Sequence, residues 1–553
     1  MPNGVQALMK TLVQGGVEVC FTNPGTSEMH FVAALDSAPQ MRAVLCLFEG
    51  VATGAADGYG RMAGKPAATL LHLGCGLGNG LANLHNARKG KVPVLNIVGD
   101  HATSHVPYDA QLQSDIETVA RNVSPQFVRT SQSTQALCRD AAQALAVAKG
   151  PPGQVATLIL PADVSWGEGG TPEPPSATAA PSCAHDDQVK ALAASIRTGG
   201  RTAMLLGGSG LREEALWIAA RIAAHSGVKL LAETFPTRLE RGAGLPAVER
   251  IAYLAEMAAV QLKGVERLIL VDTKAPVSFF AYPGRRSDLT PEGCAVETLA
   301  APDQDAVGSL KKLAIALGAD NVQAPSAPAL RPPAPRGRRL TAEKVCKAVG
   351  QLLPQDAILI DEAITSGLML AHYTAGAPRH DLLTLTGGAI GQGLPNAIGA
   401  AIACPERPVL ALIGDGSSMY TIQALWTLAR EGLNVTAVIF NNAAYSVLNV
   451  ELERVGAERI GPKARAQLDL GGAGLDFAKI AEGMGVTAVR VEETDAFCRA
   501  LAQALATPGP HLIDAVVPPA LGGLKRKLLP HVLGALDKMP SPLASAVKRK
   551  LAP

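Results

Sequence analysis

Continuous apolar segments recur along the chain, and each is followed by a longer amphipathic stretch. Clear examples are residues 92–100, 203–208, 267–272, 409–416 and 435–442. Aliphatic, β-branched runs of this length are typical of strands that are buried on both faces of a parallel sheet. Because helical patterns lie between them, the chain is predicted to be an α/β protein built from doubly wound parallel sheets.

Two Pro/Ala-rich segments without apolar periodicity, residues 166–186 and 323–338, are typical of extended linkers. They predict three doubly wound domains and a tail, and a chain of 553 residues is long enough for this division. The predicted boundaries are 1–165 for the first domain, 187–322 for the middle domain, 339–519 for the third domain and 520–553 for a basic tail.

A short internal repeat relates the two outer segments. Residues 78–87 (GNGLANLHNA) and 391–400 (GQGLPNAIGA) share five of ten positions. If the match reflects common ancestry, the first and third domains have the same architecture and a cofactor could lie between them.

Composition excludes several classes of function. The 50 basic and 48 acidic residues leave a net charge of +2, which does not suggest a nucleic-acid partner. Nine cysteines without a C-x-x-C pair indicate a reducing compartment, with no disulfide framework or zinc site. No apolar run is long enough to cross a bilayer, so stable membrane insertion is not expected and we predict a cytoplasmic protein.

The string Gly414-Asp415-Gly416-Ser417-Ser418 carries the most specific chemistry. It follows an apolar run and opens a helical pattern, and Asn442 ends the next apolar run 27 positions after Asp415. Glycines at such a turn let backbone N–H groups approach a phosphate. Carboxylate and amide oxygens suit Mg²⁺, which usually completes its shell with phosphate and water. A GDG string alone is compatible with an ordinary turn, but this context predicts a diphosphate-bearing ligand.

The sequence disfavours nicotinamide and flavin dinucleotides and nucleotides bound by a Walker motif. The glycine-rich segments 74–80, 387–393 and 414–417, which we expect to be loops, do not fit G-x-G-x-x-G, and no Walker pattern appears.

The GDG string followed by Asn-Asn resembles the signature of thiamine-diphosphate-dependent enzymes. Residues 48–61 (FEGVATGAADGYGR) are similar to the segment that carries this family's activating glutamate, so the resemblance covers nearly the whole chain. It implies a pyrimidine-binding first domain, a diphosphate-binding third domain, and thiamine diphosphate and Mg²⁺ as cofactors. It also implies that Glu49 bonds N1′ of the aminopyrimidine, whereas the sequence alone would also allow a charge at a helix N-terminus.

The same resemblance assigns further positions. Ala444 would offer its carbonyl to a metal held by Asp415 and Asn442, and Gly388 would offer its carbonyl to the 4′-amino group. Ile390 would support the bent cofactor; plain core packing would also explain this residue, and both could hold at once. The remaining cofactor-binding positions are Gly414, Gly416, Ser417 and, more loosely, Thr365.

Within the family, the chain is most similar to benzoylformate decarboxylase and to acetolactate-synthase-like proteins. Residues 23–28 (NPGTSE) resemble the decarboxylase's NPGSNE, which places Thr26 at its substrate-binding serine. Residues 71–79 (LHLGCGLGN) resemble LHSAAGTGN, which places His72 at its catalytic histidine. A histidine is suited to proton transfer because its pKa is ordinarily near neutrality. The predicted catalytic residues are therefore Glu49, His72 and Thr26.

One departure concerns the substrate pocket. Ala281 stands where the decarboxylase has a second active-site histidine, so the pocket is not expected to be that enzyme's aromatic 2-oxo-acid pocket. Phe279, Phe280 and Leu448, together with Val450, are candidates to line an apolar cavity or to belong to the core. An adjacent His-His pair and a clear flavin-binding arginine pattern are both absent.

These observations predict a homodimeric or homotetrameric lyase that decarboxylates a 2-oxo acid without oxidation. The resemblance implies that the cofactor lies between the first domain of one subunit and the third domain of another. The alternatives are an acetolactate-synthase-like carboligase or 2-hydroxyacyl-CoA lyase, which would also use an aldehyde or a CoA ester, and a non-catalytic cofactor-binding homologue.

Two sets of polar residues are left without a firm role. The weak candidates to border the cofactor are His101, His105, Gln111 and Gln113. The tail is a solvated helix, a lid, a contact for an anionic substrate or a weak membrane-docking segment; its basic residues are Lys525, Arg526, Lys527, Lys538, Lys548, Arg549 and Lys550.

Overall fold

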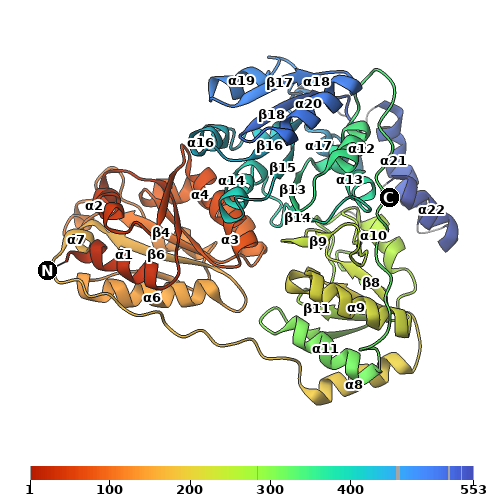
Figure 1. The fold of residues 1–553 in the computed structure, drawn as a ribbon, viewed down its shortest axis with the longest axis horizontal. Coiled ribbons are helices and arrows are strands. Elements are labelled where there is room, and N and C mark those ends of the chain that lie inside the picture. The colour runs from red at the N-terminus through yellow and green to blue at the C-terminus, as the bar shows by residue number, and fades with distance from the viewer. Residues whose placement is uncertain (1, 283, 456–460, 521–522, 537–538, 552–553) are drawn as a thin grey trace.

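A computed structural model describes residues 2–282, 284–455, 461–520, 523–536 and 539–551. The chain forms three α/β domains, each built on its own sheet (Figure 1). An extended segment, residues 167–185, leads from the first domain to the middle domain, and the C-terminal helices lie beside the middle and third domains (Figure 1).

The first domain contains a six-stranded parallel sheet in the order β2-β1-β3-β4-β6-β5. Strands β3 and β6 are buried along their whole length, as their apolar sequences predict. The strands are β1 (Val19–Asn23), β2 (Arg42–Leu45), β3 (Ala67–Leu71), β4 (Val94–Asp100), β5 (Val128–Thr130) and β6 (Val155–Pro161). The helices are α1 (Gly4–Gln14), η1 (Thr26–Glu28), α2 (Met29–Ala34), η2 (Leu35–Ser37), α3 (Glu49–Ala63), α4 (Leu73–Lys89), η3 (Val106–Tyr108), α5 (Ile116–Arg121), α6 (Thr134–Lys149) and α7 (Ala162–Trp166).

The third domain repeats this topology. Its sheet has the order β17-β18-β16-β15-β13-β14-β9, so its own six strands, numbered along the chain, run 2-1-3-4-6-5, as in the first domain. The strands are β13 (Ala357–Glu362), β14 (His380–Thr384), β15 (Val409–Gly414), β16 (Val435–Asn441), β17 (Thr487–Val491) and β18 (His511–Val516). The helices are α12 (Ala342–Leu352), η5 (Ile364–Gly367), α13 (Leu370–Tyr373), α14 (Gly393–Ala403), α15 (Asp415–Ser418), α16 (Ala424–Glu431), α17 (Ser446–Arg454), α18 (Pro462–Ala466), α19 (Phe477–Gly483) and α20 (Thr494–Ala506).

The predicted common architecture is therefore present, but the ten-residue match does not reflect it. Residues 78–87 lie in α4, which follows the third strand of its sheet, whereas residues 391–400 lead into α14, which follows the second strand of its sheet. The topological equivalent of α14 is α3, and these two helices pack against each other between the outer domains (Figure 1). Glycine and alanine are frequent in all of these helices, so short identities arise without equivalence.

The middle domain has a five-stranded parallel sheet in the order β10-β8-β7-β11-β12. It also supplies β9 (Leu239–Arg241), which pairs antiparallel with β14 at the edge of the third sheet, a departure from an all-parallel sheet. The strands are β7 (Thr202–Leu206), β8 (Lys229–Ala232), β10 (Glu249–Arg250), β11 (Arg267–Val271) and β12 (Ala295–Ala300). The helices are α8 (Asp186–Arg197), η4 (Gly208–Leu211), α9 (Glu213–Ser226), α10 (Ala255–Leu262) and α11 (Ala306–Leu317).

Two local predictions are wrong. The glycine-rich segment 74–80 is not a loop but the first two turns of α4, which begins directly after His72. The helical pattern after Asp415 is split into α15 and α16. In α4 the missing side chains allow close packing, because a Cβ on Gly80 would lie 2.9 Å from Thr53 Cγ2 of α3. Tertiary packing therefore outweighs the low helix propensity of glycine.

The tail contains α21 (Gly523–Leu536) and α22 (Ser541–Leu551), which pack on α10. Leu529, Leu533 and Leu536 form a buried cluster with Met257 and Val450. Val450 is thus a core residue and not a wall of a substrate cavity. Lys548 is 7 % exposed and donates to Glu249 Oε1 at 2.5 Å.

The other basic groups of the tail, those of Lys525, Arg526, Lys527, Lys538, Arg549 and Lys550, lie outside the described side chains. In the part of the chain that the structure describes, no helix is long and apolar enough to cross a membrane. All nine cysteines are free thiols.

Candidate active site

Both outer sheets present polar residues at the point where their strand order reverses. In the first sheet this point lies between β1 and β3, which lead into Thr26 and His72. In the third sheet it lies between β13 and β15, which lead into Thr365 and Asp415. Ligands of open α/β sheets bind in the crevice at this edge. The duplicated topology therefore creates two equivalent crevices with different chemistry.

Asp415 and Asn442 are brought together at the carboxyl edge of the third sheet. Asp415 is 3 % exposed; its Oδ1 accepts the Gly416 N–H at 2.8 Å, and its Oδ2 accepts the Asn442 N–H at 2.9 Å. Burial raises the pKa of Asp415, whereas these backbone N–H groups oppose the increase. Asn442 Oδ1 accepts the Ala444 N–H and the Ser446 hydroxyl, both at 3.1 Å.

This donor set fits a magnesium-bound diphosphate. Ala443 has a left-handed backbone (φ 55°), the Asn442 side chain folds back to accept the Ala444 N–H, and the Asp415 carboxylate and the Asn442 amide thus lie at one strand edge. No group of three or more His, Cys, Asp or Glu residues that could hold a metal occurs among the described residues. A cation here would therefore need further oxygens from a ligand, which is the usual way Mg²⁺ binds phosphates. Gly414, Gly416 and Ser417 adjoin Asp415 in the same turn.

The segment that carries Gly388 and Ile390 is held by Glu362 at the end of β13. Glu362 is 2 % exposed, and its carboxylate accepts the backbone N–H groups of Gly391 and Gly393 at 2.6 Å each. Burial raises the pKa of Glu362 to about 7, although these N–H groups lower it. Gly388 has a φ of 78°, and Ile390 is half-buried outside the described core clusters. The sequence patterns predicted no role for Glu362.

Helix α4 of the first domain binds the same segment across the domain boundary. Asn83 Nδ2 donates to Gly50 O at 2.7 Å and to Gly391 O at 3.2 Å. Asn86 Nδ2 donates to Ala389 O at 2.8 Å, and Asn86 Oδ1 accepts the Ala389 N–H at 3.2 Å. Hydrogen bonds of these two asparagines thus connect the start of the Glu49 helix, α3, to the glycine-rich segment of the third domain. The sequence contained both asparagines in its repeat, but nothing in it indicated this contact.

Glu49 is the first residue of α3 and is 9 % exposed. Its Oε2 accepts from Asn79 Nδ2 at 3.0 Å. A Cβ on Gly76 would lie 3.0 Å from Glu49 Oε1 and 3.5 Å from His72 Cβ, so Glu49 and His72 flank the same glycine. Two predicted catalytic residues that are 23 positions apart in the sequence therefore share one small region.

The segment that carries Thr26 packs directly on His72. Thr26 begins η1, and a Cβ on Gly25 would lie 2.4 Å from the His72 ring. His72 Nδ1 lies 2.7 Å from Oε2 of Glu28, a buried residue that sequence reasoning did not single out. The NPGTSE string thus supplies a carboxylate next to the imidazole and carries Thr26 on the same short turn.

The predicted substrate-pocket residues come from two domains. Phe279 packs over the segment that carries Gly388, because a Cβ on Gly388 would lie 2.4 Å from Phe279 Cζ. Phe280 lies against Phe279, with ring centroids 4.9 Å apart. Both rings remain exposed (41 % for Phe279 and 55 % for Phe280), as do Ala281 and Leu448, so none of the four is a core residue.

The remaining candidates lie on η5 of the third domain and on the loop that follows β4 of the first domain. Thr365 is half-buried in η5, next to Ser366, whose hydroxyl lies 3.4 Å from Asn442 Nδ2. The rings of His101 and His105 lie 5.2 Å apart.

Gln111 is exposed, whereas Gln113 has a buried carbonyl oxygen without a hydrogen-bond partner in the described chain.

The crevice of the middle sheet is occupied by carboxylates. Between β7 and β11, Asp272 Oδ2 accepts from the Ser209 N–H and hydroxyl at 2.8 Å each, and Glu233 Oε1 accepts the Gly208 N–H at 3.3 Å. Lys91 of the first domain closes the crevice by donating to Asp272 Oδ1 at 3.2 Å. Acidic groups already use the N–H groups that a dinucleotide phosphate would need, in agreement with the missing nucleotide fingerprint.

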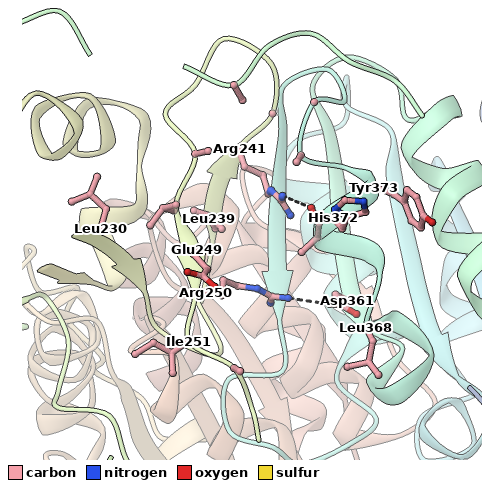
Figure 2. A pocket seen from close by; sticks show the side chains of 18 of the residues that line it. Leu230, Leu239, Arg241, Glu249, Arg250, Ile251, Asp361, Leu368, His372 and Tyr373 are labelled. Atoms are coloured by element: carbon pink, nitrogen blue, oxygen red, sulfur yellow. Dashed lines mark hydrogen bonds and ion pairs between the residues drawn. The ribbon is translucent and has the colours of Figure 1, made fainter. Parts of the chain in front are cut away.

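A separate cavity of about 1300 Å³ lies between the middle and third domains. Figure 2 shows Arg241 and Arg250 pointing into it; Arg241 Nη2 donates to Ala371 O at 2.7 Å, and Arg250 Nη2 lies 3.9 Å from Asp361 Oδ2. None of the predicted catalytic, cofactor, metal or substrate residues lines this cavity. The cavity is therefore distinct from the candidate active site.

The fold and the site define the class of protein: an α/β protein of three doubly wound domains whose two equivalent outer domains meet near their switch points. Residues 2–123 match the model of the N-terminal TPP binding domain of thiamine pyrophosphate enzymes, and residues 365–515 match that of the C-terminal TPP binding domain. A relative from Mycobacterium tuberculosis, named "Putative acetolactate synthase large subunit IlvX", is 56% identical over 524 residues, which cover 94% of this chain and 100% of the relative. The chain therefore belongs to the thiamine pyrophosphate enzyme family, and it is similar to members named for two different reactions.

The second reaction appears in more distant relatives. Benzoylformate decarboxylase from Pseudomonas aeruginosa is 29% identical over 543 residues, which cover 92% of this chain and 97% of the relative. The solved structure of the thiamine diphosphate-dependent 4-hydroxybenzoylformate decarboxylase of Rhodococcus jostii RHA1 has a TM-score of 0.81 at 23% identity and covers 94% of this chain and 99% of that chain. At this identity the likeness is one of fold.

Proposed function

We propose that this protein catalyses the thiamine-diphosphate- and Mg²⁺-dependent, non-oxidative decarboxylation of a 2-oxo acid. The observation that carries the proposal is the position of Glu49 and His72 on either side of Gly76 in the first domain. A buried carboxyl and an imidazole in one small region form an acid–base pair suited to moving protons at a carbonyl compound. A purely structural homologue would not need both groups there.

Asp415, Asn442 and the Ala444 carbonyl would hold the magnesium ion, and Gly414, Gly416 and Ser417 would contact the diphosphate. Gly388, Ile390 and Thr365 would orient the rest of the cofactor from the segments held by Glu362 and η5. When bound, thiamine diphosphate supplies the electron sink for the carbon that loses CO₂.

The chain's own residues supply binding and proton control. Glu49 would hold a proton at the aminopyrimidine ring, and the Thr26 hydroxyl would hold the substrate carboxylate. His72 would transfer the proton that the product needs, because Ala281 leaves no second imidazole at the opposite wall. Phe279 and Phe280, with Leu448, would exclude water and contact the substrate's side chain.

Carboligation is the second candidate, and the name of the 56% identical relative favours it. In that case a second carbonyl compound, and not a proton, captures the reacting carbon. We also propose a homodimer or homotetramer, because the family resemblance implies a cofactor site shared between two subunits.

The test uses the full chain reconstituted with thiamine diphosphate and Mg²⁺. A panel of aliphatic and aromatic 2-oxo acids is followed by CO₂ release, with and without an added aldehyde, and products are identified by mass spectrometry. Release of CO₂ from one 2-oxo acid alone, with an aldehyde product and strong loss in Glu49→Gln, is the expected result. If CO₂ appears only together with a ligated product, or if only a CoA ester is cleaved, the protein is a carboligase or lyase; no turnover of any kind would leave the non-catalytic homologue.

A further inference from the structure

The buried carboxylate of Glu28 lies behind the His72 ring. Glu28 Oε2 lies 2.7 Å from His72 Nδ1, and the side chain of Glu28 is fully buried while that of His72 is 22% exposed. Nδ1 of the imidazole therefore faces Glu28 inside the domain, and Nε2 is the nitrogen that remains available to a ligand in the crevice.

The geometry around Oε2 decides which partner carries the proton. Oε2 also accepts the Gly25 N–H at 2.7 Å, so this oxygen already acts as an acceptor. An ionised carboxylate can only accept hydrogen bonds. His72 Nδ1 then carries the hydrogen, and Nε2 is the basic nitrogen.

Two glycines leave room for this pair. A Cβ on Gly25 would lie 2.4 Å from His72 Nδ1, and a Cβ on Gly99 at the end of β4 would lie 1.6 Å from Glu28 Oε1. Glu28 Oε1 itself is buried without a hydrogen-bond partner in the described chain. Burial raises the pKa of Glu28, whereas the Gly25 N–H and His72 lower it. A buried carboxylate with one unsatisfied oxygen costs free energy that capping one turn of η1 does not require, which points to a role beyond capping.

We infer that Glu28 is the positioning residue of the active site: it fixes His72 in the Nδ1–H tautomer, with Nε2 directed to the reacting atoms. This inference rests on the proposed role of His72 in proton transfer. The side chain of Glu28 is fully buried, so in this role it would act through His72 alone. It predicts that the effect of removing the Glu28 charge depends on the presence of the imidazole.

The kinetic test is a double-mutant cycle on the reconstituted full chain, with Glu28→Gln, His72→Asn and the double variant. Glu28→Gln should lower kcat about 10- to 100-fold with little change in KM, as loss of an orienting partner typically does. In the His72→Asn background, Glu28→Gln should lower kcat by less than about 3-fold, because coupled residues are non-additive. Equal losses in both backgrounds would show that Glu28 is only a helix cap.

The matched control is Asp140→Asn. Asp140 is another buried carboxylate of the first domain, 4 % exposed, and it accepts from Arg129 Nη1 and the Ser131 hydroxyl at 3.0 Å each. It should lower thermal stability without changing kcat. Binding of thiamine diphosphate and the melting temperature are measured for every variant, so that misfolding is recognised.

A second measurement needs no turnover. In protein labelled with ¹⁵N-histidine, the His72 ring signals, assigned by their loss in His72→Asn, should show a protonated Nδ1 and an unprotonated Nε2 at neutral pH. Glu28→Ala should convert them to a tautomer mixture. An Nε2–H tautomer in the wild type would overturn the inference even if decarboxylation is observed, whereas an inactive wild type with the Nδ1–H tautomer would refute only the proposed function.

Discussion

Arg61 and Asp57 form an ion pair within the Glu49 helix, α3, and both bond to the third domain, so removal of the pair should loosen the contact between the two outer domains. Both side chains are fully buried; Arg61 Nε and Nη2 donate to the two Asp57 oxygens at 2.8 and 2.9 Å. Arg61 also donates to Thr384 O and to the Thr386 hydroxyl, each at 2.8 Å. Those threonines lie directly before the segment that carries Gly388.

Arg61→Met leaves the Asp57 carboxylate buried with only amide donors from Gln392 and Asn396. Breaking one partner of a buried ion pair typically costs about 3–5 kcal/mol. Since about 1.4 kcal/mol corresponds to a factor of ten, the opening equilibrium of α3 against α14 should rise by about two to three and a half orders of magnitude. Asp57→Asn in the same chain removes the buried charge and should restore at least about 1 kcal/mol.

Hydrogen exchange followed by mass spectrometry on peptides from α3 and α14 measures this local opening and does not require the three domains to unfold in one step. The control is Arg42→Met, which removes the 2.6 Å pair between Arg42 and Glu431, also a contact between the outer domains but with an Arg42 side chain that is 44% exposed. An exposed pair contributes about 0 to 1 kcal/mol. If Arg61→Met accelerates exchange no more than Arg42→Met, the buried network does not hold the domains together.

Three further predictions follow from single residues. Burial lowers the pKa of His380 from 6.5 to about 4, so between these pH values only the unfolded state binds the extra proton. The free energy of unfolding should therefore fall by up to about 3 kcal/mol as pH decreases from 6.5 to 4. His380→Asn, which retains a donor for Pro378 O, should abolish this part of the pH dependence, measured by hydrogen exchange of β14. Asp415→Asn should weaken Mg²⁺-dependent retention of thiamine diphosphate by at least about 10- to 100-fold in calorimetric titration, and unchanged affinity would remove it from the metal site. Phe279→Ala opens the space above Gly388, so the kcat/KM ratio of bulky to small 2-oxo acids should rise by about tenfold or more, and a constant ratio would place the side-chain pocket elsewhere.

The apolar patterns were sufficient for the buried strands and the fold class, because a run such as β16 has only one favourable environment, the interior of a parallel sheet. The closeness of Asp415 and Asn442 could also be predicted, since each directly follows a strand of the same sheet and the two thus meet at one edge. In both cases the information is local or follows from a topological rule.

What the sequence could not predict depends on a partner elsewhere in the chain. Val450 was a candidate to line an apolar cavity, but its packing against the tail residue Leu529 makes it a core residue. The glycine-rich segment 74–80 suggested a loop, but it forms a helix because Gly76 and Gly80 pack closely on Glu49 and Thr53 of α3. Glu28 had no predicted role, and only the fold places it beside His72, which follows the neighbouring strand β3 and caps α4.

The two outer domains have the same topology but carry different chemical groups at the edges of their sheets. The first domain places ionisable groups, Glu49 and His72, at its edge, whereas the third domain places the oxygen ligands Asp415 and Asn442 there. In the proposed mechanism, proton transfer and cation binding are therefore assigned to separate sheets, and α3 packs on α14 where the two outer domains of one chain meet. That packing is backbone to backbone: a Cβ on Gly399 would lie 1.9 Å from Ala55 O. Because close-packed backbones cannot slide without a clash, the contact fixes how the two outer domains of one chain lie relative to each other, and thus the position from which each would complete a site shared with a second subunit.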